Sequence, residues 1–281
     1  PLASHSRDRR FALERIIAAN RKAVTLPSLA DEWLAQSPLQ DEQLLPLAGV
    51  LRELGRVDDL LALWKRLESS QLRDGALASE VIGAAVAGGR AESAESVCRD
   101  MLAAQPGNLA WAASMLRLLI DRGAYDDADA FLRAEAGRAD SAASRLRLAQ
   151  LASGAGRYGV ALELCRQIDG ASVTDQLAAL CLQASLEHQQ GDQPRAQQTL
   201  RTAAILAREK GDLRQIVSVS ESMEQLGARP AAIELLAEAR PREHGDELAR
   251  RIAWLLEQEN RLPEAQAIWQ SLWQSATDDT R

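Results

Sequence analysis

The three histidines are the first residues in this sequence that could support acid–base or metal chemistry. They are His5, His188 and His244, and none of them belongs to a His-Glu-x-x-His motif. The sequence also lacks a Gly-x-Ser-x-Gly nucleophile elbow and a glycine loop of the type that binds phosphate. We therefore predict that the chain is not an enzyme and that it holds no cofactor and no metal.

The three cysteines offer a second route to chemistry, through a disulfide framework or a metal site. They are Cys98, Cys165 and Cys181, an odd number with no Cys-x-x-Cys spacing. This pattern fits neither a set of disulfides nor a paired ligand set, so we interpret the cysteines as small buried apolar residues.

The amino-acid composition indicates which kind of secondary structure positions the side chains of this protein. The chain has 281 residues, of which 46% are hydrophobic, 26% charged and only 4% aromatic. A chain of this length can bury a sizeable core, and abundant Ala and Leu with few aromatic residues favours packed helices over a β-sandwich. The composition therefore predicts an all-α protein.

The net charge of the chain limits the kinds of partner that it can bind. There are 33 basic and 40 acidic residues, a net charge of −7 that repels nucleic acid and anionic lipid, and no apolar stretch approaches the length of about 20 residues that spans a bilayer. We predict no nucleic-acid binding and no membrane contact by this segment. The first residue is not Met and the start is no signal peptide, so we expect a piece of a longer protein.

A small turn residue recurs along the chain at intervals close to 34 residues. The turn residues are Gly55, Gly89, Gly123, Gly156, Gly191, Gly227 and Asn260, separated by 34, 34, 33, 35, 36 and 33 residues. Five residues later stand Leu60, Ala94, Ala128, Ala161, Ala196, Ala232 and Ala265. Apolar residues follow at offset nine, and at offset twelve only Glu135 breaks the pattern. These offsets predict a helix with one buried stripe after each turn.

The boundaries of these helices have independent signals. Pro194, Pro230 and Pro263 each stand three residues after a turn residue, where a first-turn proline has no amide hydrogen to lose. A second apolar stripe precedes each turn and predicts a first helix. Small residues at offset five would let the two helices cross closely, and each hairpin would stack on the next.

A hairpin of about 34 residues with Gly-x-Tyr-x-x-Ala at its turn, as in the segments 123–128 and 156–161, resembles the tetratricopeptide (TPR) repeat. Pro106 stands where that family places its closing proline, and Pro38 would do so in a degenerate first repeat whose turn lies near Arg21. The resemblance implies a right-handed α-solenoid of about eight TPR-like helix-turn-helix repeats, a single domain over 1–281. The expected repeats are 7–40, 41–74, 75–108, 109–141, 142–176, 177–212, 213–245 and 246–281.

The sequence departs from the family pattern before Gly191, where Gln183 and Glu187 occupy positions that are apolar elsewhere. We expect a longer helix or an altered superhelical angle around residues 180–227. The Lys and Asn residues that would grip a C-terminal carboxylate in chaperone-binding TPR proteins are also absent from the groove positions.

The resemblance implies that the first helices line a concave groove, which binds segments of other proteins. The candidate partner-binding residues in this register are Arg117, Arg214, Arg250, Trp254 and Glu257. Trp254 would be an interface anchor; the alternative is a displaced core residue, or one that packs on a segment outside this chain. By contrast, Trp64 and Trp269 stand at core positions and should be structural.

The predicted function is a non-catalytic scaffold that binds another protein through the groove or an edge, with self-association through exposed terminal repeats as a further option. A high ratio of Arg to Lys suggests a GC-rich bacterium, where degenerate TPR arrays are similar to periplasmic scaffolds of exopolysaccharide export of the PelB type. That resemblance implies that the scaffold recruits a polysaccharide-modifying enzyme. The alternative is a cytoplasmic sensing domain of a transcription activator, which reduced cysteines favour. A helical enzyme subunit is the third interpretation.

Overall fold

The computed structural model describes residues 2–36, 39, 41–67, 75–168, 172–239 and 245–278. Every regular element in these ranges is helical, with sixteen helices and no strand, so the predicted all-α fold of about eight helical hairpins is confirmed. Pro38 and His244 lie outside the described residues.

The chain forms two compact units, Pro1–Phe131 and Leu132–Arg281. The first unit contains α1 (Leu2–Ala23), α2 (Leu26–Ala35), α3 (Asp41–Glu53), α4 (Val57–Lys65), α5 (Gly75–Ala87), α6 (Ala91–Ala104) and α7 (Leu109–Asp121). Helix α8 (Tyr125–Arg138) includes the boundary. The second unit contains α9 (Ala142–Gly154), α10 (Tyr158–Arg166), α11 (Val173–Gln189), α12 (Gln193–Lys210), α13 (Leu213–Gln225), α14 (Arg229–Ala239), α15 (Gly245–Gln258) and α16 (Leu262–Asp278).

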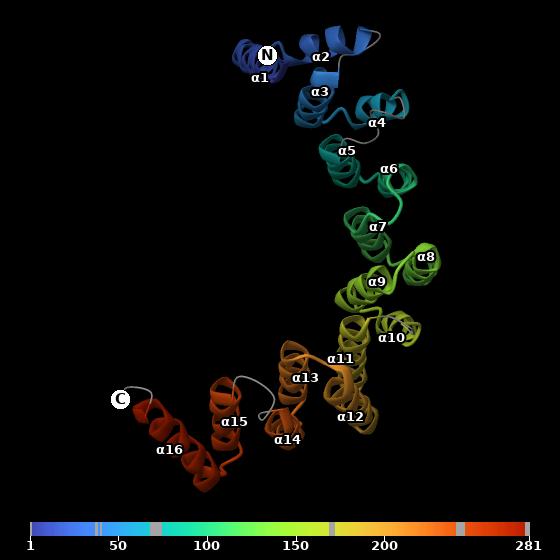
Figure 1. Ribbon diagram of the computed structural model, residues 1–281. Coiled ribbons are helices and arrows are strands. Elements are labelled where there is room, and N and C mark those ends of the chain that lie inside the picture. Colours follow the sequence, from blue (N-terminus) through green and yellow to red (C-terminus); the bar gives the residue numbers. More distant parts are fainter. Residues whose placement is uncertain are drawn as a thin grey trace. The chain divides into compact units, whose positions relative to one another are not determined.

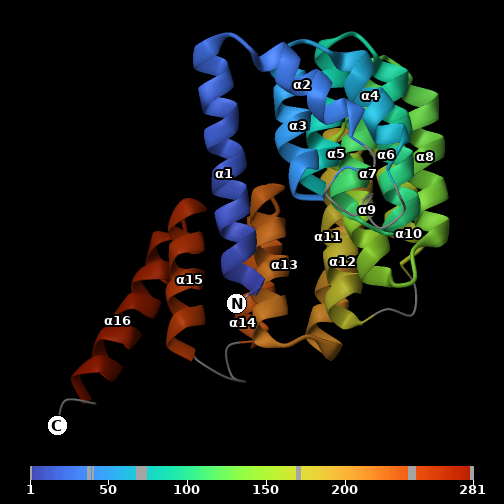
Figure 2. The same ribbon diagram turned by 90° about the horizontal axis from the view of Figure 1, so that it is seen from above.

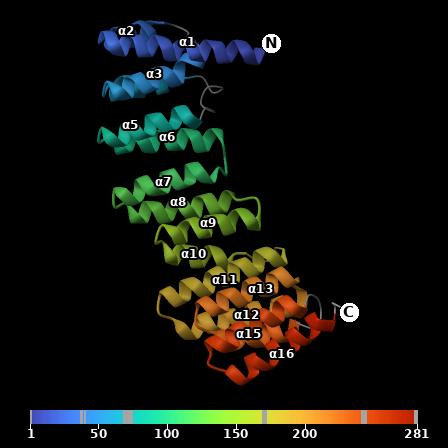
Figure 3. The ribbon, with the colours of Figure 1, turned by 90° about the vertical axis from the view of Figure 1, so that its left-hand side faces the viewer.

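Within each unit, consecutive helices pair as hairpins, and the second helix of one hairpin packs on the first helix of the next (Figure 1). In the first unit, α5 and α6 lie alongside each other, and α6 in turn packs on α7 (Figure 3). In the second unit, the same order runs from α11 and α12 through α13 and α14 to α15 and α16. The repeated sequence pattern therefore produces repeated contacts between neighbours.

Each predicted turn residue has a left-handed backbone conformation. The φ angle is +68° at Gly55, +75° at Gly123 and +57° at Asn260, and the other four turn glycines are also positive. The two amides at each turn bond back to the first helix, as Gly55 N to Arg52 O at 3.0 Å and Arg56 N to Leu51 O at 2.9 Å. This is the Schellman arrangement, which satisfies carbonyls left open at a helix end and explains why glycine recurs there.

The first hairpin ends its first helix three residues later than the sequence suggested. Its turn is at Val24, with φ of +58°, and not near Arg21. The backbone bonds are those of the other turns, since Val24 N donates to Arg21 O and Thr25 N to Asn20 O. A valine in this conformation gives no sequence signal, because β-branched residues rarely adopt a positive φ.

Small residues at offset five allow the two helices of each hairpin to approach closely. Ala94, Ala128, Ala161 and Ala232 are completely buried, and Ala196 and Ala265 are 1% exposed. The prolines also lie where expected, since Pro194, Pro230 and Pro263 are each the second residue of a helix. The helix starts and the close crossing were therefore predicted correctly from spacing.

The hairpin of α11 and α12 is longer than its neighbours, as expected from the shifted apolar stripe. Its helices have 17 and 18 residues. The helices of the hairpins on either side, α9 and α10 and then α13 and α14, have 9 to 13 residues. Glu187 at the shifted position is 3% exposed and bonds to Thr199 of α12. The longer hairpin thus buries a carboxylate between its two helices.

Candidate protein-binding groove

A cleft of about 610 Å³ lies between α13 and α15, the first helices of the last two hairpins. Its lining residues are Asp212, Leu213, Arg214, Val217, Ser218, Glu221, Glu247 and Leu248. Four of these eight, Arg214, Val217, Glu221 and Glu247, stand at the positions that the repeat register assigns to the groove. Half of the lining of this cleft therefore comes from positions that the repeat register assigns to the groove.

The start of α13, at one end of this cleft, is capped by side-chain hydrogen bonds. The Asp212 side chain accepts a hydrogen bond of 2.9 Å from Gln215 N, and the Gln215 side chain accepts one of 2.8 Å from Asp212 N. This capping box satisfies two backbone amides at the helix start. Gln215 Nε2 also donates to Thr174 Oγ1 on α11 at 2.8 Å, which ties α13 to the preceding hairpin.

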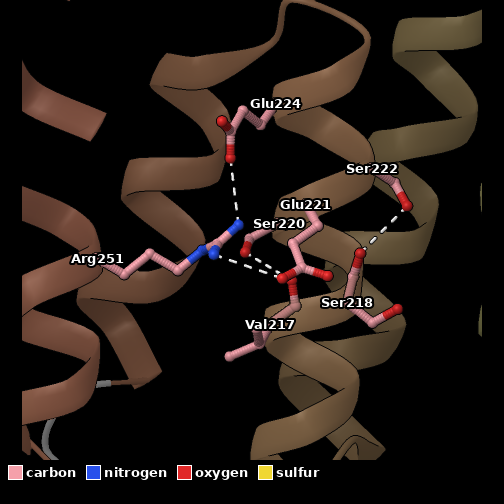
Figure 4. A network of polar contacts seen from close by, with 7 residues as sticks. All are labelled: Val217, Ser218, Ser220, Glu221, Ser222, Glu224 and Arg251. Atoms are coloured by element: carbon pink, nitrogen blue, oxygen red, sulfur yellow. Dashed lines mark hydrogen bonds and ion pairs between the residues drawn. The ribbon is translucent and has the colours of Figure 1, made fainter. Parts of the chain in front are cut away.

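The other end of the cleft is crosslinked by Arg251, which the repeat register does not place in the groove. Arg251 of α15 contacts Glu224 at 3.2 Å and Glu221 at 3.4 Å, so one guanidinium bridges two carboxylates of α13 (Figure 4). The Arg251 side chain is 29% exposed. Its neighbour Arg250 was selected because it has the groove phase, whereas Arg251 points toward α13. The signal that could have identified it is the pair of glutamates one repeat earlier.

The candidate residues on α15 lie on its exposed side. Trp254 is 44% exposed, so it is not a core residue. Arg250 is exposed, and its Nε donates to Asp246 O at 3.2 Å. Glu257 accepts a hydrogen bond of 2.8 Å from Trp269 Nε1. Residues at intervals of three or four share one side of a helix, so these three candidates form a strip along α15.

The remaining two candidates do not belong to this strip. Arg214 of α13 lines the cleft itself. Arg117 of α7 belongs to the first unit, where its side chain is 84% exposed and its Nε is 3.7 Å from Asp121 on the next turn. An exposed pair of this kind contributes little to stability.

The two tryptophans that stand at core positions of the repeat differ in their burial. Trp64 is 4% exposed and its Nε1 donates to Asp100 at 2.9 Å, as befits a core position. Trp269 holds the same repeat position but is 37% exposed. The difference arises because Trp64 is covered by the next hairpin, whereas α16 is the last helix in the structure.

A second cleft, of about 530 Å³, lies in the first unit between α6, α7 and α8. The Glu95 carboxylate in its wall is 4% exposed, and its oxygens lie 3.3 Å from Arg122 Nη1 and 3.5 Å from Arg99 Nη2. Two guanidinium groups therefore already compensate the buried charge of Glu95.

The described residues contain no group of three or more His, Cys, Asp or Glu side chains that could hold a metal ion. Two of the cysteines, Cys98 and Cys165, are buried, and burial raises the pKa of each thiol to about 12. The pKa of Cys181, which is partly exposed, is also raised by burial. Such thiols are protonated at neutral pH and are poor nucleophiles. Across the described helices, none has both the length and the apolar character needed to cross a bilayer.

No protein-family model matches the sequence, and no curated protein matches it. Among solved structures, the chain is similar to a tetratricopeptide repeat protein from Parabacteroides merdae, with 15% identity, 92% of this chain and 98% of that chain covered, and a TM-score of 0.34. It is also similar to the C-terminal part of a TPR repeat-containing protein from Cytophaga hutchinsonii, with 12% identity, 81% and 93% covered and a TM-score of 0.37. For the MamA protein the identity is 16%, the coverage 58% and 88%, and the TM-score 0.32.

Proposed function

We propose that the chain is a non-catalytic scaffold that binds a segment of another protein in the groove between α13 and α15. The observation that carries this proposal is the 610 Å³ cleft, which combines an apolar floor with charged side chains at its rim. Leu213, Val217 and Leu248 supply the apolar surface, and Arg214 and Glu247 are exposed beside it. A cleft of this composition suits a short helix or an extended segment with alternating apolar and charged residues.

Ordered contacts at the two ends of the cleft support a binding role. The capping box at Asp212 fixes the start of α13, and the bridge from Arg251 holds α15 against α13 before a partner arrives. A site that is already ordered loses less conformational entropy on binding. The strip of Arg250, Trp254 and Glu257 on α15 would extend the contact beyond the cleft, with Trp254 as its anchor.

The test uses a displayed peptide library selected against the wild-type protein, with dissociation constants then measured for the selected peptides. We expect the double variant Val217→Lys, Glu247→Lys to weaken binding by about tenfold or more, because it places charge on the floor and reverses charge at the rim. Asp126→Lys, at an exposed position of α8, makes the same acid-to-base change as Glu247→Lys away from the cleft and should bind normally. Equal binding by the double variant and the wild type would reject the groove as the site.

A second measurement separates the strip from the cleft. The variant Arg250→Ala, Trp254→Ala should also weaken the selected peptides, with circular dichroism confirming that both hairpins remain folded. If peptides lose affinity only in the cleft variant, the binding surface is confined to the cleft.

For the biological setting, we propose a bacterial assembly, with exopolysaccharide export in the periplasm as the first candidate. The support is compositional: 33 basic residues include only three lysines, and the array is long and degenerate. The alternative is a cytoplasmic regulatory domain, which the three free cysteines favour. Fractionation of the native bacterium with an antibody to this chain distinguishes the two, since recovery from the periplasm would reject the regulatory role.

A further inference from the structure

The side chains that line the cleft between α13 and α15 carry more negative than positive charge. The two helices run alongside each other within the second unit (Figure 2). Three of the charged lining residues are acidic and one is basic, and they are Asp212, Glu221, Glu247 and Arg214. This negative charge lies beside the apolar floor of Leu213, Val217 and Leu248.

Contacts within the protein compensate only part of this negative charge. Arg251 lies 3.4 Å from Glu221 and 3.2 Å from Glu224, so one guanidinium serves two carboxylates. Asp212 caps the start of α13. Glu247 is exposed and forms no ion pair with another described residue. Glu247 is therefore the acidic group at the rim that a partner can reach.

Trp254 adds an aromatic surface to the groove side of α15. It is 44% exposed, and Glu257 follows three residues later on the same side of the helix. Trp254 stands six residues before its turn, and this repeat position is also exposed in hairpins that another hairpin follows, at Gly83, Arg117, Gln150 and Glu221. The exposure of Trp254 is therefore typical of its position in the repeat.

An indole next to a carboxylate suits a positively charged group. A Lys ammonium or Arg guanidinium over the indole face gains a cation–π interaction, and a nearby carboxylate adds an ion pair. Glu257 accepts its hydrogen bond from the neutral indole of Trp269, so its negative charge is not compensated by that bond. Arg250, one turn before Trp254, donates from Nε to Asp246 O of its own helix at 3.2 Å.

We propose that the segment bound in this cleft is basic and amphipathic, with apolar side chains on the floor and Lys or Arg side chains toward Glu247 and Trp254. The inference rests on the proposed groove function, because it names the chemistry of the segment that the groove binds. Opposite charges around an apolar contact favour this pairing and disfavour acidic segments. Binding therefore weakens with rising salt.

The test uses two synthetic amphipathic peptides of about 14 residues, which form about four helical turns and share one leucine face. One peptide has lysine on its polar face, and the other has glutamate at the same positions. Isothermal titration calorimetry should show that the wild type binds the lysine peptide about tenfold more tightly or better. Glu247→Lys should weaken the lysine peptide by about fivefold and strengthen the glutamate peptide.

Two further variants separate the charge preference from the location of the site. Glu234→Lys makes the same acid-to-base change at an exposed position of α14 outside the cleft and should leave both affinities unchanged. Val217→Gln makes the floor polar without changing the charge and should weaken any peptide that occupies the cleft. Circular dichroism confirms that each variant folds as the wild type does.

Equal affinity for the two peptides, or tighter binding of the glutamate peptide, overturns the basic partner. So does an equal loss with Glu234→Lys and Glu247→Lys, because the peptide then responds only to net charge. In these cases the groove function stands if Val217→Gln weakens the peptides. A lysine peptide that does not bind also rejects the basic partner, and the library selection then decides on the groove. If the lysine peptide binds and Val217→Gln has no effect, both proposals fail.

Discussion

The carboxylate of Glu187 accepts a hydrogen bond of 2.7 Å from the hydroxyl of Thr199, which joins α11 to α12 inside the long hairpin. Glu187 is 3% exposed and Thr199 is 8% exposed. Gln183 Nε2 donates a second bond of 2.8 Å to the same carboxylate. Burying a carboxylate costs free energy because the group loses its hydration. The hydrogen bonds from Thr199 and Gln183 offset that cost for Glu187.

Thr199→Val should destabilise the second unit by about 1–3 kcal/mol, because it removes a donor and leaves the buried carboxylate with one bond fewer. Chemical denaturation followed by circular dichroism measures the change. The double variant Glu187→Leu, Thr199→Val replaces both partners by apolar groups and should recover most of the loss. If the double variant is as unstable as the single one, the loss arises from packing at Thr199 and not from the carboxylate.

Replacing glycine by alanine should have opposite effects on stability at two positions of the first unit. Gly123 has φ of +75° at the turn before α8, and Gly83 lies inside α5 with no atom within 4 Å of an added Cβ. Gly123→Ala should therefore destabilise by about 1 kcal/mol, because L-residues are disfavoured in the left-handed region. Gly83→Ala should stabilise by about 0.5–1 kcal/mol, because alanine is a better helix former. Thermal unfolding of the two variants gives the comparison, and equal shifts would contradict it.

Features that lie within one repeat are predictable from the sequence, and features that depend on how neighbouring helices are rotated are not. The turn at Gly123 and the close crossing at Ala128 follow from backbone sterics and helix spacing, which a single repeat contains, and both were predicted correctly. The bridge from Arg251 to Glu221 depends on how α15 is rotated against α13, and single-repeat spacing does not encode that rotation. The burial of Trp64 likewise depends on the next hairpin, where Asp100 of α6 accepts a hydrogen bond from its Nε1.

The cysteines should be unreactive in the folded protein. Burial raises the pKa of Cys98 and Cys165 to about 12, so thiolate forms only as the pH approaches that value. At about pH 8, iodoacetamide should modify neither residue without denaturant and all three cysteines in urea. Cys181, which is partly exposed, should be the first to react. Peptide mass spectrometry after timed alkylation identifies the order, and rapid native modification of Cys98 would contradict the burial.

The ion pair between Arg21 of α1 and Glu53 of α3 should make the first unit sensitive to acid. Arg21 Nε donates to Glu53 Oε1 at 2.8 Å, and this hydrogen bond holds the pKa of the Glu53 carboxyl below its ordinary value. Because the folded pKa is the lower one, the contribution is complete above the ordinary carboxyl pKa and disappears as the pH falls through the lowered value. Glu53→Gln should therefore lower Tm slightly at neutral pH. It should leave Tm unchanged when the pH is below the lowered pKa of Glu53. Glu209→Gln, at an exposed site on α12, is the control, and a difference that persisted at low pH would show that Glu53 acts through packing and not through charge.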